Sequence, residues 1–154
     1  MSDAPSVLIV EGRFYDDIAD ELYKGASRVL DEAGVAYERL AVPGAFEIPQ
    51  AIRFAIRSME IGSASNRYAG FIGLGCVIRG GTTHYDYVCQ ESARALMDIP
   101  MTYSVALGYG ILTCENWDQA WERADVTQKN KGGAVASACL RMMDVKKHLR
   151  LVLR

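Results

Sequence analysis

The chain has 154 residues, 50% of them hydrophobic, and a formal net charge of -2. This length is typical of one domain with a proper core, so we treat residues 1–154 as a single domain. The weakly acidic balance, without a dense run of Lys or Arg, excludes the electrostatic footprint of a nucleic-acid-binding protein or of one held on an anionic membrane. Small molecules and proteins are the expected partners, and neither nucleic acid nor membrane.

Targeting signals and cysteines narrow the class further. No apolar run reaches the roughly 18 residues that a membrane span needs. Residues 1–12 lack the basic flank and cleavage site of a signal peptide, which indicates a cytoplasmic protein. The four cysteines (Cys76, Cys89, Cys114 and Cys139) are far apart and form no Cys-x-x-Cys pair. They are expected to be buried free thiols rather than a disulfide framework or a zinc site.

Strand-like and helix-like segments alternate along the chain. Apolar runs predict strands at 6–12, 35–42, 68–78 and 101–108, helical periodicity predicts helices at 16–35, 48–62, 84–99, 116–124 and 132–149, and residues 63–67 predict a turn. Nearly continuous apolar strands are typical of a parallel sheet with helices on both faces. Right-handed crossovers then give an α/β fold, a three-layer αβα sandwich with a four-stranded parallel sheet of flavodoxin-like order.

In such a sheet, ligands bind beyond the carboxyl ends of the strands. The segments expected there are 13–15, 43–47, 79–84 and 109–116. Within 79-RGGTTH-84 the two glycines leave backbone amides open, and Thr82 and Thr83 are suited to cap a helix. An open helix N-terminus binds anions, with phosphate as the obvious ligand, although the same residues also suit a simple tight turn.

His84 would lie in the first turn of that helix, where it is a plausible proton-transfer residue at neutral pH or an ordinary surface histidine. His148, among basic residues near the other end of the chain, is expected to be solvated. Two histidines so far apart, without carboxylates at ligand spacing, argue against a metal site. Walker, dinucleotide and Gly-x-Ser-x-Gly motifs are also missing, so neither a nucleotide cofactor nor a serine nucleophile is expected.

Several segments together resemble lumazine synthases. They are 42-VPGAFEIP-49, 78-IRGGTTHYDYV-88, 112-LTCENWDQAWERA-124 and 129-KNKGG-133, and with Phe14 they cover nearly the whole chain in the order and spacing of that family. The resemblance implies a transferase that condenses 5-amino-6-(D-ribitylamino)uracil with 3,4-dihydroxy-2-butanone 4-phosphate. The product is 6,7-dimethyl-8-ribityllumazine, in the penultimate step of riboflavin biosynthesis. No metal or organic cofactor is implied.

The resemblance also implies residue roles. His84 would transfer protons, Gly81 and Thr82 would bind the phosphate through their amides, and Arg123 would clamp it. The residues implied for the pyrimidine and ribityl groups are Phe14, which would stack on the ring, Ala45, Phe46 and Glu47, and the backbone of Cys76, Val77 and Ile78. Tyr109 stands where the family often has phenylalanine, and Lys131 where it has a lysine near the substrate.

In that family the site lies between subunits, which implies a homopentamer with Phe14 and His84 on one side and Tyr109, Arg123 and Lys131 on the other. Residues 125–130 lack the glycines that many capsid-forming members have, which argues against a cage, although a larger capsid stays open. Tyr15 stands where many members have asparagine. The alternatives to the enzyme are a non-catalytic flavin- or lumazine-binding module and a flavodoxin-like regulatory or scaffold domain.

Overall fold

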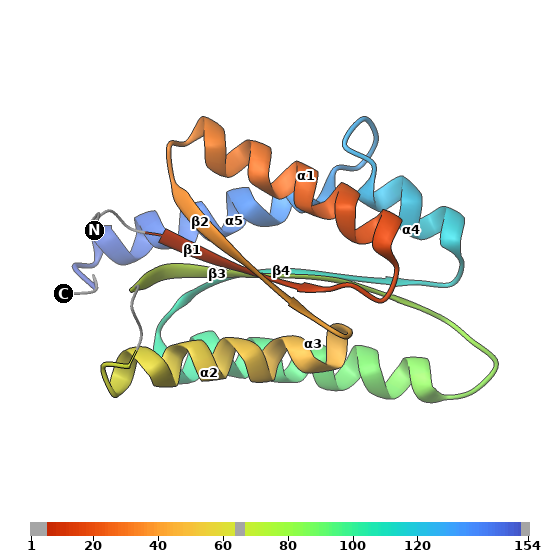
Figure 1. The fold of residues 1–154 in the computed structure, drawn as a ribbon, viewed down its shortest axis with the longest axis horizontal. Coiled ribbons are helices and arrows are strands. Elements are labelled where there is room, and N and C mark those ends of the chain that lie inside the picture. The colour runs from red at the N-terminus through yellow and green to blue at the C-terminus, as the bar shows by residue number, and fades with distance from the viewer. Residues whose placement is uncertain (1–5, 64–66, 152–154) are drawn as a thin grey trace.

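The computed structural model describes residues 6–63 and 67–151, which form a sheet between two layers of helices (Figure 1). The strands are β1 (Ser6–Gly12), β2 (Ala36–Val42), β3 (Tyr68–Ile78) and β4 (Ala106–Cys114), in the order β2-β1-β3-β4, and every pair is parallel. The predicted three-layer fold of flavodoxin-like order is therefore confirmed.

The helices return the chain from the carboxyl end of each strand to the start of the next (Figure 1). One face of the sheet is covered by α1 (Asp16–Glu32), α4 (Trp117–Ala124) and α5 (Lys131–His148). The other face is covered by α2 (Ile48–Glu60) and α3 (His84–Tyr103), and a short 3-10 helix, η1 (Ala45–Glu47), precedes α2. Among the described residues, none of the helices combines the length and the apolar character needed to cross a bilayer.

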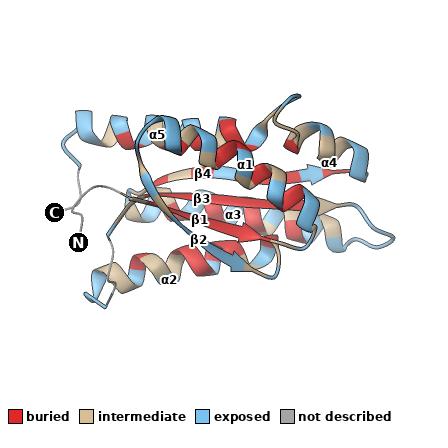
Figure 2. Cartoon of the chain, turned by 45° about the horizontal axis from the view of Figure 1, so that its top comes forward, coloured by how far each residue is buried: buried red, intermediate tan, exposed pale blue. Residues whose placement is uncertain are grey.

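Alternate side chains of β1 build two separate cores, and Figure 2 shows the strand in the colour of buried residues. Val7 and Ile9 pack toward α1 and α5, whereas Leu8 and Val10 pack toward α2 and α3. Removing each such side chain from water stabilises the fold by about 1.5–3 kcal/mol. The apolar run that predicted the strand reflects this burial on both faces.

The periodicity of the first predicted helix is also confirmed. Ile18, Leu22, Ala26 and Leu30 are fully buried along one face of α1. The helix ends at Glu32, earlier than predicted, and Gly34 follows with a φ of +69°. Glycine adopts this left-handed conformation without steric cost, which explains the stop.

The fourth strand does not lie where the sequence pattern predicted it. The strand predicted at 101–108 is wrong, because α3 continues through Pro100 to Tyr103 and β4 begins only at Ala106. Proline removes its own N–H from the helix and its ring crowds the carbonyl four residues earlier, yet the amide of Ser104 still donates to the Pro100 carbonyl at 3.0 Å. The helix then stops at Ser104, whose φ of 54° is left-handed.

Two glycines lie in the true strand where neighbouring elements come close to it. A Cβ at Gly108 would lie 2.6 Å from the Val135 carbonyl oxygen, and one at Gly110 would lie 2.7 Å from the Gly73 carbonyl oxygen. The strand therefore needs glycine for the close approach of α5 and β3. The turn predicted at 63–67 includes residues 64–66, which lie outside the described residues.

All four cysteines are free thiols. Cys76, Cys114 and Cys139 are buried as predicted, whereas Cys89 is only half-buried. Burial raises the pKa of the Cys76 and Cys139 thiols to about 12. Neither group is an available thiolate nucleophile at neutral pH.

Candidate active site

The carboxyl ends of β1 and β3 form the switch point of the sheet. From β1 the chain moves to one neighbour, β2, and afterwards to the other, β3. The loops that follow these strands lie at one edge of the sheet, at the right of Figure 1. In open parallel sheets, ligands bind in the crevice at such a switch point.

The loop after β2 packs directly against the end of β1. A Cβ at Gly12 would lie 2.7 Å from the Gly44 carbonyl carbon and 2.9 Å from the Ala45 amide nitrogen. Only glycine at this position allows the approach. It brings the segment containing Ala45, Phe46 and Glu47 to the end of the strand that leads to Phe14.

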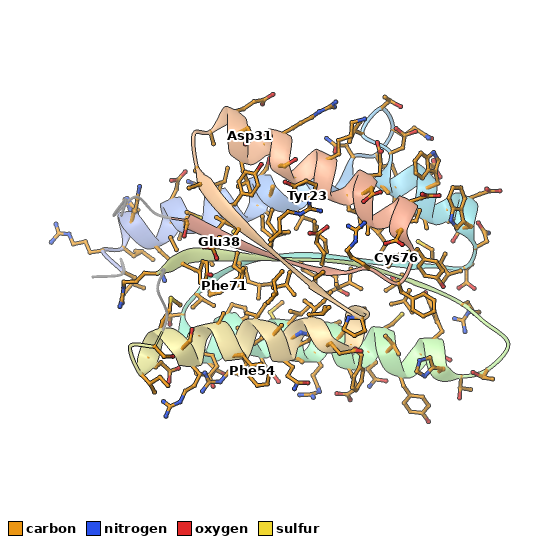
Figure 3. The ribbon with its side chains drawn as sticks, viewed as in Figure 1. Tyr23, Asp31, Glu38, Phe54, Phe71 and Cys76 are labelled. Carbon is orange, nitrogen blue, oxygen red and sulfur yellow. The ribbon has the colours of Figure 1, made fainter. Side chains whose placement is uncertain are left out.

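β3 extends beyond its neighbour on the β1 side. Its pairing with β1 stops at Leu74, whereas its pairing with β4 continues to Ile78. The backbone of residues 75–78 therefore leaves the β1-facing edge of the strand open to hydrogen bonds with a ligand. The Cys76 side chain is buried toward α1, so the backbone is what this residue can offer (Figure 3).

The loop from Gly80 to His84 is open. A Cβ added at Gly80 or Gly81 would meet nothing within 4 Å, and His84 is exposed. Thr83 occupies the N-cap position of α3 without a side-chain cap bond, contrary to the expected capping role, while the Thr82 hydroxyl accepts from the His84 amide at 3.3 Å. The helix dipole and open amides give this end of α3 an attraction for anions.

Arg79 anchors this loop, a role that the sequence did not predict. Its Nε donates to Glu115 at 2.7 Å, its Nη1 lies 3.4 Å from the Asp86 carboxylate, and its amide donates to the Cys114 carbonyl at 2.9 Å. The guanidinium also lies 4.3 Å from the centre of the Tyr85 ring. An arginine that ends an apolar strand before two glycines was the available signal, but its partners are distant in sequence.

Two aromatic rings of the predicted site are exposed. Phe14 is 73% exposed and Phe46 is 61% exposed. Large apolar side chains left in water at a switch point are typical of ligand or protein contacts. The Phe14 ring makes an edge contact with Tyr15, with 4.9 Å between ring centres, and Tyr15 packs against the core.

Three predicted residues lie apart from this group. Tyr109 is within β4, opposite Gly73, so the expectation that 109–116 follows the strand is wrong for residues 109–114. Arg123 lies on α4 and Lys131 begins α5, on the opposite face of the sheet from the helix that carries His84 (Figure 1). The Arg123 Nη1 donates to the Gln119 carbonyl at 3.1 Å.

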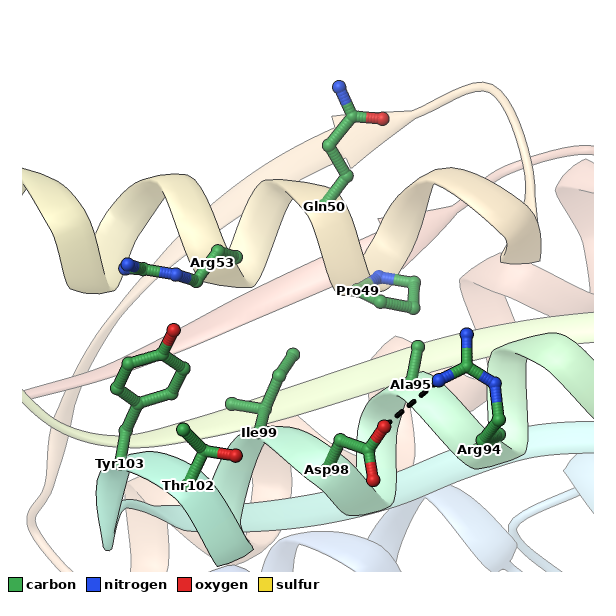
Figure 4. Close-up of a pocket in the computed structure, with 9 residues that line it drawn as sticks. All are labelled: Pro49, Gln50, Arg53, Arg94, Ala95, Asp98, Ile99, Thr102 and Tyr103. Atoms are coloured by element: carbon green, nitrogen blue, oxygen red, sulfur yellow. Dashed lines mark hydrogen bonds and ion pairs between the residues drawn. The ribbon is translucent and has the colours of Figure 1, made fainter.

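A hollow of about 370 Å³ lies elsewhere, between α2 and α3 (Figure 4). Its arginines are already engaged: Arg94 pairs with Asp98 at 2.9 Å, and Arg53 lies 4.4 Å from the centre of the Tyr103 ring. Arg94 is also about 15 Å along the helix from His84. This hollow is therefore separate from the switch-point site.

Comparison with known proteins identifies the family. Residues 4–147 match the family model described as 6,7-dimethyl-8-ribityllumazine synthase. The chain belongs to this family. The 6,7-dimethyl-8-ribityllumazine synthase 1 of Rhizobium meliloti is 53% identical over 143 residues, which cover 93% of this chain and 92% of that protein. The 6,7-dimethyl-8-ribityllumazine synthases of Paramagnetospirillum magneticum and Agrobacterium fabrum are each 50% identical over 145 residues, 94% of this chain and 97% of each relative.

Membership of the lumazine synthase family confirms the resemblance predicted from the motifs. It also confirms the predicted enzyme class, a transferase of riboflavin biosynthesis. None of these matches favours a non-catalytic flavin- or lumazine-binding module.

Proposed function

We propose that this chain condenses 5-amino-6-(D-ribitylamino)uracil with 3,4-dihydroxy-2-butanone 4-phosphate, and that the loops at the switch point perform the reaction. The amine attacks the ketone, a Schiff base forms, phosphate is eliminated and the ring closes, giving 6,7-dimethyl-8-ribityllumazine, phosphate and water. The observation that carries the proposal is the match over residues 4–147 to the family described as 6,7-dimethyl-8-ribityllumazine synthase. The whole chain then acts as a single domain, and we assign it to the cytoplasm.

The phosphate substrate binds at the start of α3. Gly81 and Thr82 offer amides at an open loop, and the helix dipole favours the anion. Arg123 supplies a cation that clamps the same phosphate, with Lys131 near the substrate. Hydrogen bonds from amides and arginine stabilise the charge that develops as phosphate leaves, without a covalent catalyst or a metal.

The pyrimidine substrate binds beside β1 and β3. Its ring stacks on the exposed ring of Phe14, and its polar edge bonds to the backbone of Cys76, Val77 and Ile78 where β3 extends past β1. Glu47 accepts hydrogen bonds from ribityl hydroxyls, with Ala45 and Phe46 lining the same part of the site. Holding both substrates together supplies much of the acceleration.

His84 transfers protons in this reaction. Its place in the first turn of α3 puts the imidazole next to the amides assigned to the phosphate and leaves it accessible to substrate. Schiff-base formation, phosphate elimination and ring closure each require proton movement, which a positioned histidine can provide.

The complete site forms between subunits of a homopentamer. This assignment is supported by the separation of the His84 helix from the helices of Arg123 and Lys131 on opposite faces of one chain. A neighbouring subunit would bring Tyr109, Arg123 and Lys131 to the His84 loop. Each partial site would then be completed by the next subunit around the ring.

A product-formation assay tests the function. Purified protein is mixed with both substrates, each is then omitted in turn, and lumazine is followed by absorbance and fluorescence. Product should require both substrates and form well above the spontaneous rate, and the His84→Ala variant should be slower by on the order of a hundredfold while retaining some activity. An assembled oligomer that gives no acceleration, while still binding lumazine or flavin, would make the protein a binding module instead.

A further inference from the structure

A carboxylate is buried beside the proposed site but outside it. Glu11, near the carboxyl end of β1, is 1% exposed and follows four buried apolar residues, 7–10. Taking a carboxylate out of water is strongly unfavourable unless partners compensate for the lost hydration. The partners of Glu11 therefore indicate what its burial achieves.

Two arginines occupy both oxygens of this carboxylate. Arg39 donates from Nε to Oε2 at 2.8 Å and from Nη2 to Oε1 at 3.0 Å. Arg13 donates from Nη1 to Oε1 at 2.8 Å. Paired arginine donors of this kind restrict the geometry more tightly than a single hydrogen bond does. Glu11 thus connects β2 to the residue that follows β1.

Arg13 carries the connection into α1. Its Nη2 bonds the Asp20 carboxylate and lies 3.4 Å from Asp16, and its amide donates to the Val42 carbonyl at 3.1 Å. Arg39 is itself held, because its guanidinium lies 3.4 Å from the centre of the Tyr23 ring on α1. Figure 3 shows Tyr23 on the α1 side of the sheet. The cluster therefore fixes β1, β2 and the start of α1 to one another.

The residue next to Arg13 is Phe14. Its ring is 73% exposed, so the packing of the ring itself does little to set its direction. The turn that presents the ring is instead held by the Arg13 side chain on one side and by Tyr15, packed against the core, on the other. A ligand that stacks on a ring held in place in advance loses less entropy on binding than one that must order the ring.

We propose that Glu11 is a positioning residue for the pyrimidine substrate: its carboxylate holds Arg13 and Arg39, and thereby the turn that presents Phe14. This inference rests on the proposed function, which assigns ring stacking to Phe14. Glu11 does not touch substrate, and it acts through Phe14 on pyrimidine binding rather than on phosphate binding or proton transfer.

Glu11→Gln is the direct test. Both carboxylate oxygens accept from arginine, so the amide group of glutamine meets an arginine donor in either orientation and the cluster loosens. The matched control is Glu60→Gln, because Glu60 also accepts from two arginines, Arg53 and Arg57, each at 3.2 Å, but at the far end of α2.

Steady-state kinetics with each substrate varied in turn give the readout. For Glu11→Gln the KM of the pyrimidine should rise about tenfold, while the KM of the phosphate substrate stays within about twofold and kcat within about threefold. Glu60→Gln should change none of the three. An unchanged pyrimidine KM, or an equal effect on both substrates, would overturn the proposal.

A double-mutant cycle separates positioning from general stability. In a Phe14→Ala background, Glu11→Gln should raise the pyrimidine KM by less than about twofold, because the ring to be positioned is gone. A full tenfold effect in that background refutes action through Phe14. If Phe14→Ala alone leaves the pyrimidine KM unchanged, the stacking role of Phe14 is wrong and this inference is wrong with it. If Phe14→Ala raises the pyrimidine KM but Glu11→Gln does not, only this inference is wrong.

Arg39→Gln keeps the test valid if Glu11→Gln does not fold. The Arg39 side chain is 44% exposed, so its replacement disturbs the core less than a change at Glu11. The ion pair between Glu11 and Arg13 stays in place in this variant. The pyrimidine KM should rise about threefold, again without a matching change for the phosphate substrate. An unchanged pyrimidine KM for a folded Arg39→Gln oligomer would contradict the role assigned to the cluster.

Discussion

At the residue scale, the proposed chemistry is divided between side chains on opposite faces of the sheet. His84 begins α3 and Arg123 lies on α4, while Phe14 follows β1. Each is assigned to a different part of the two substrates. Substitutions should therefore affect the two KM values and kcat in different proportions.

Arg123→Ala should mainly weaken use of the phosphate substrate. Because an arginine pairs with phosphate through charge and hydrogen bonds, its loss should raise the KM of that substrate about tenfold and leave the pyrimidine KM within about twofold. Arg28→Ala, an exposed arginine near the far end of α1, is the matched control and should change neither. Equal loss of affinity for the pyrimidine would contradict the assignment of Arg123.

The Cys139 thiol makes a prediction about stability at high pH. Burial raises its pKa from 9.0 to about 12, so the unfolded chain loses this proton above pH 9 while the folded chain keeps it. The contribution of the buried thiol to the free energy of unfolding is fully present below pH 9 and is lost as the pH rises toward 12. The free energy of unfolding of the unaltered protein should therefore fall between pH 8 and pH 10. In the Cys139→Ala variant this fall should be smaller by about 1 kcal/mol.

Urea unfolding at pH 8 and pH 10 measures this difference for Cys139→Ala. Cys89→Ala serves as the control, because that thiol is only half-buried and should produce a smaller change. If the Cys139→Ala protein lost as much stability with pH as the unaltered protein, burial of this thiol would not be the cause.

The sequence predicted where the exposed candidate residues lie better than it predicted which residues hold them in place. The motifs that follow the predicted strands contain Phe14, Phe46 and the Gly80–His84 loop. The fold class alone therefore predicted that these residues lie at the same end of the sheet. Glu11 and Arg79 gave no comparable signal, because Glu11 pairs with an arginine 28 residues away and Arg79 with a glutamate 36 residues away. Such pairs depend on strand register, which no local pattern specifies.

At the element scale, the packing of α5 on α1 depends on glycine. A Cβ at Gly132 would overlap the carbonyl oxygen of Leu22 in α1. The two helices could accept alanine there only by moving apart. The same close approach recurs where α5 crosses β4 at Gly108, so α5 has little freedom to shift.

Gly132→Ala should therefore lower the free energy of unfolding by about 3 kcal/mol or more, as expected for overpacking against backbone. Gly44→Ala is the control: its φ of -161° suits any residue, and an added Cβ meets nothing within 4 Å. Its stability should stay within about 1 kcal/mol of the unaltered protein. Chemical denaturation of both variants tests the claim, and similar losses for the two would show that the helix contact is not limiting.

The predicted strand bounds are correct where helices cover both faces of the strand. β1 and β3 have the predicted bounds because both of their faces are covered. β4 was misplaced because α3 continues through Pro100 and the strand continues through Gly110, and in each case tertiary packing overrides the local preference.

At the scale of the whole molecule, the site that we propose is divided between distant parts of one chain. The loop before α3 is open, and the cation assigned to the same phosphate lies on the other side of the sheet. The sequence could indicate a site shared between subunits only through its resemblance to lumazine synthases, since no local motif marks the surfaces that would meet. A shared site predicts that activity depends on assembly, so sedimentation should find a pentamer in the active fraction and no active monomer.

Subunit mixing tests the central claim most directly. His84→Ala and Arg123→Ala chains with different tags are coexpressed, oligomers carrying both tags are purified, and lumazine formation is measured at low phosphate substrate. If each site takes His84 from one subunit and Arg123 from its neighbour, an equal mixture has about a quarter of its sites intact and should regain about a quarter of the unaltered activity. Activity no higher than the mean of the two variants would contradict a site shared between subunits.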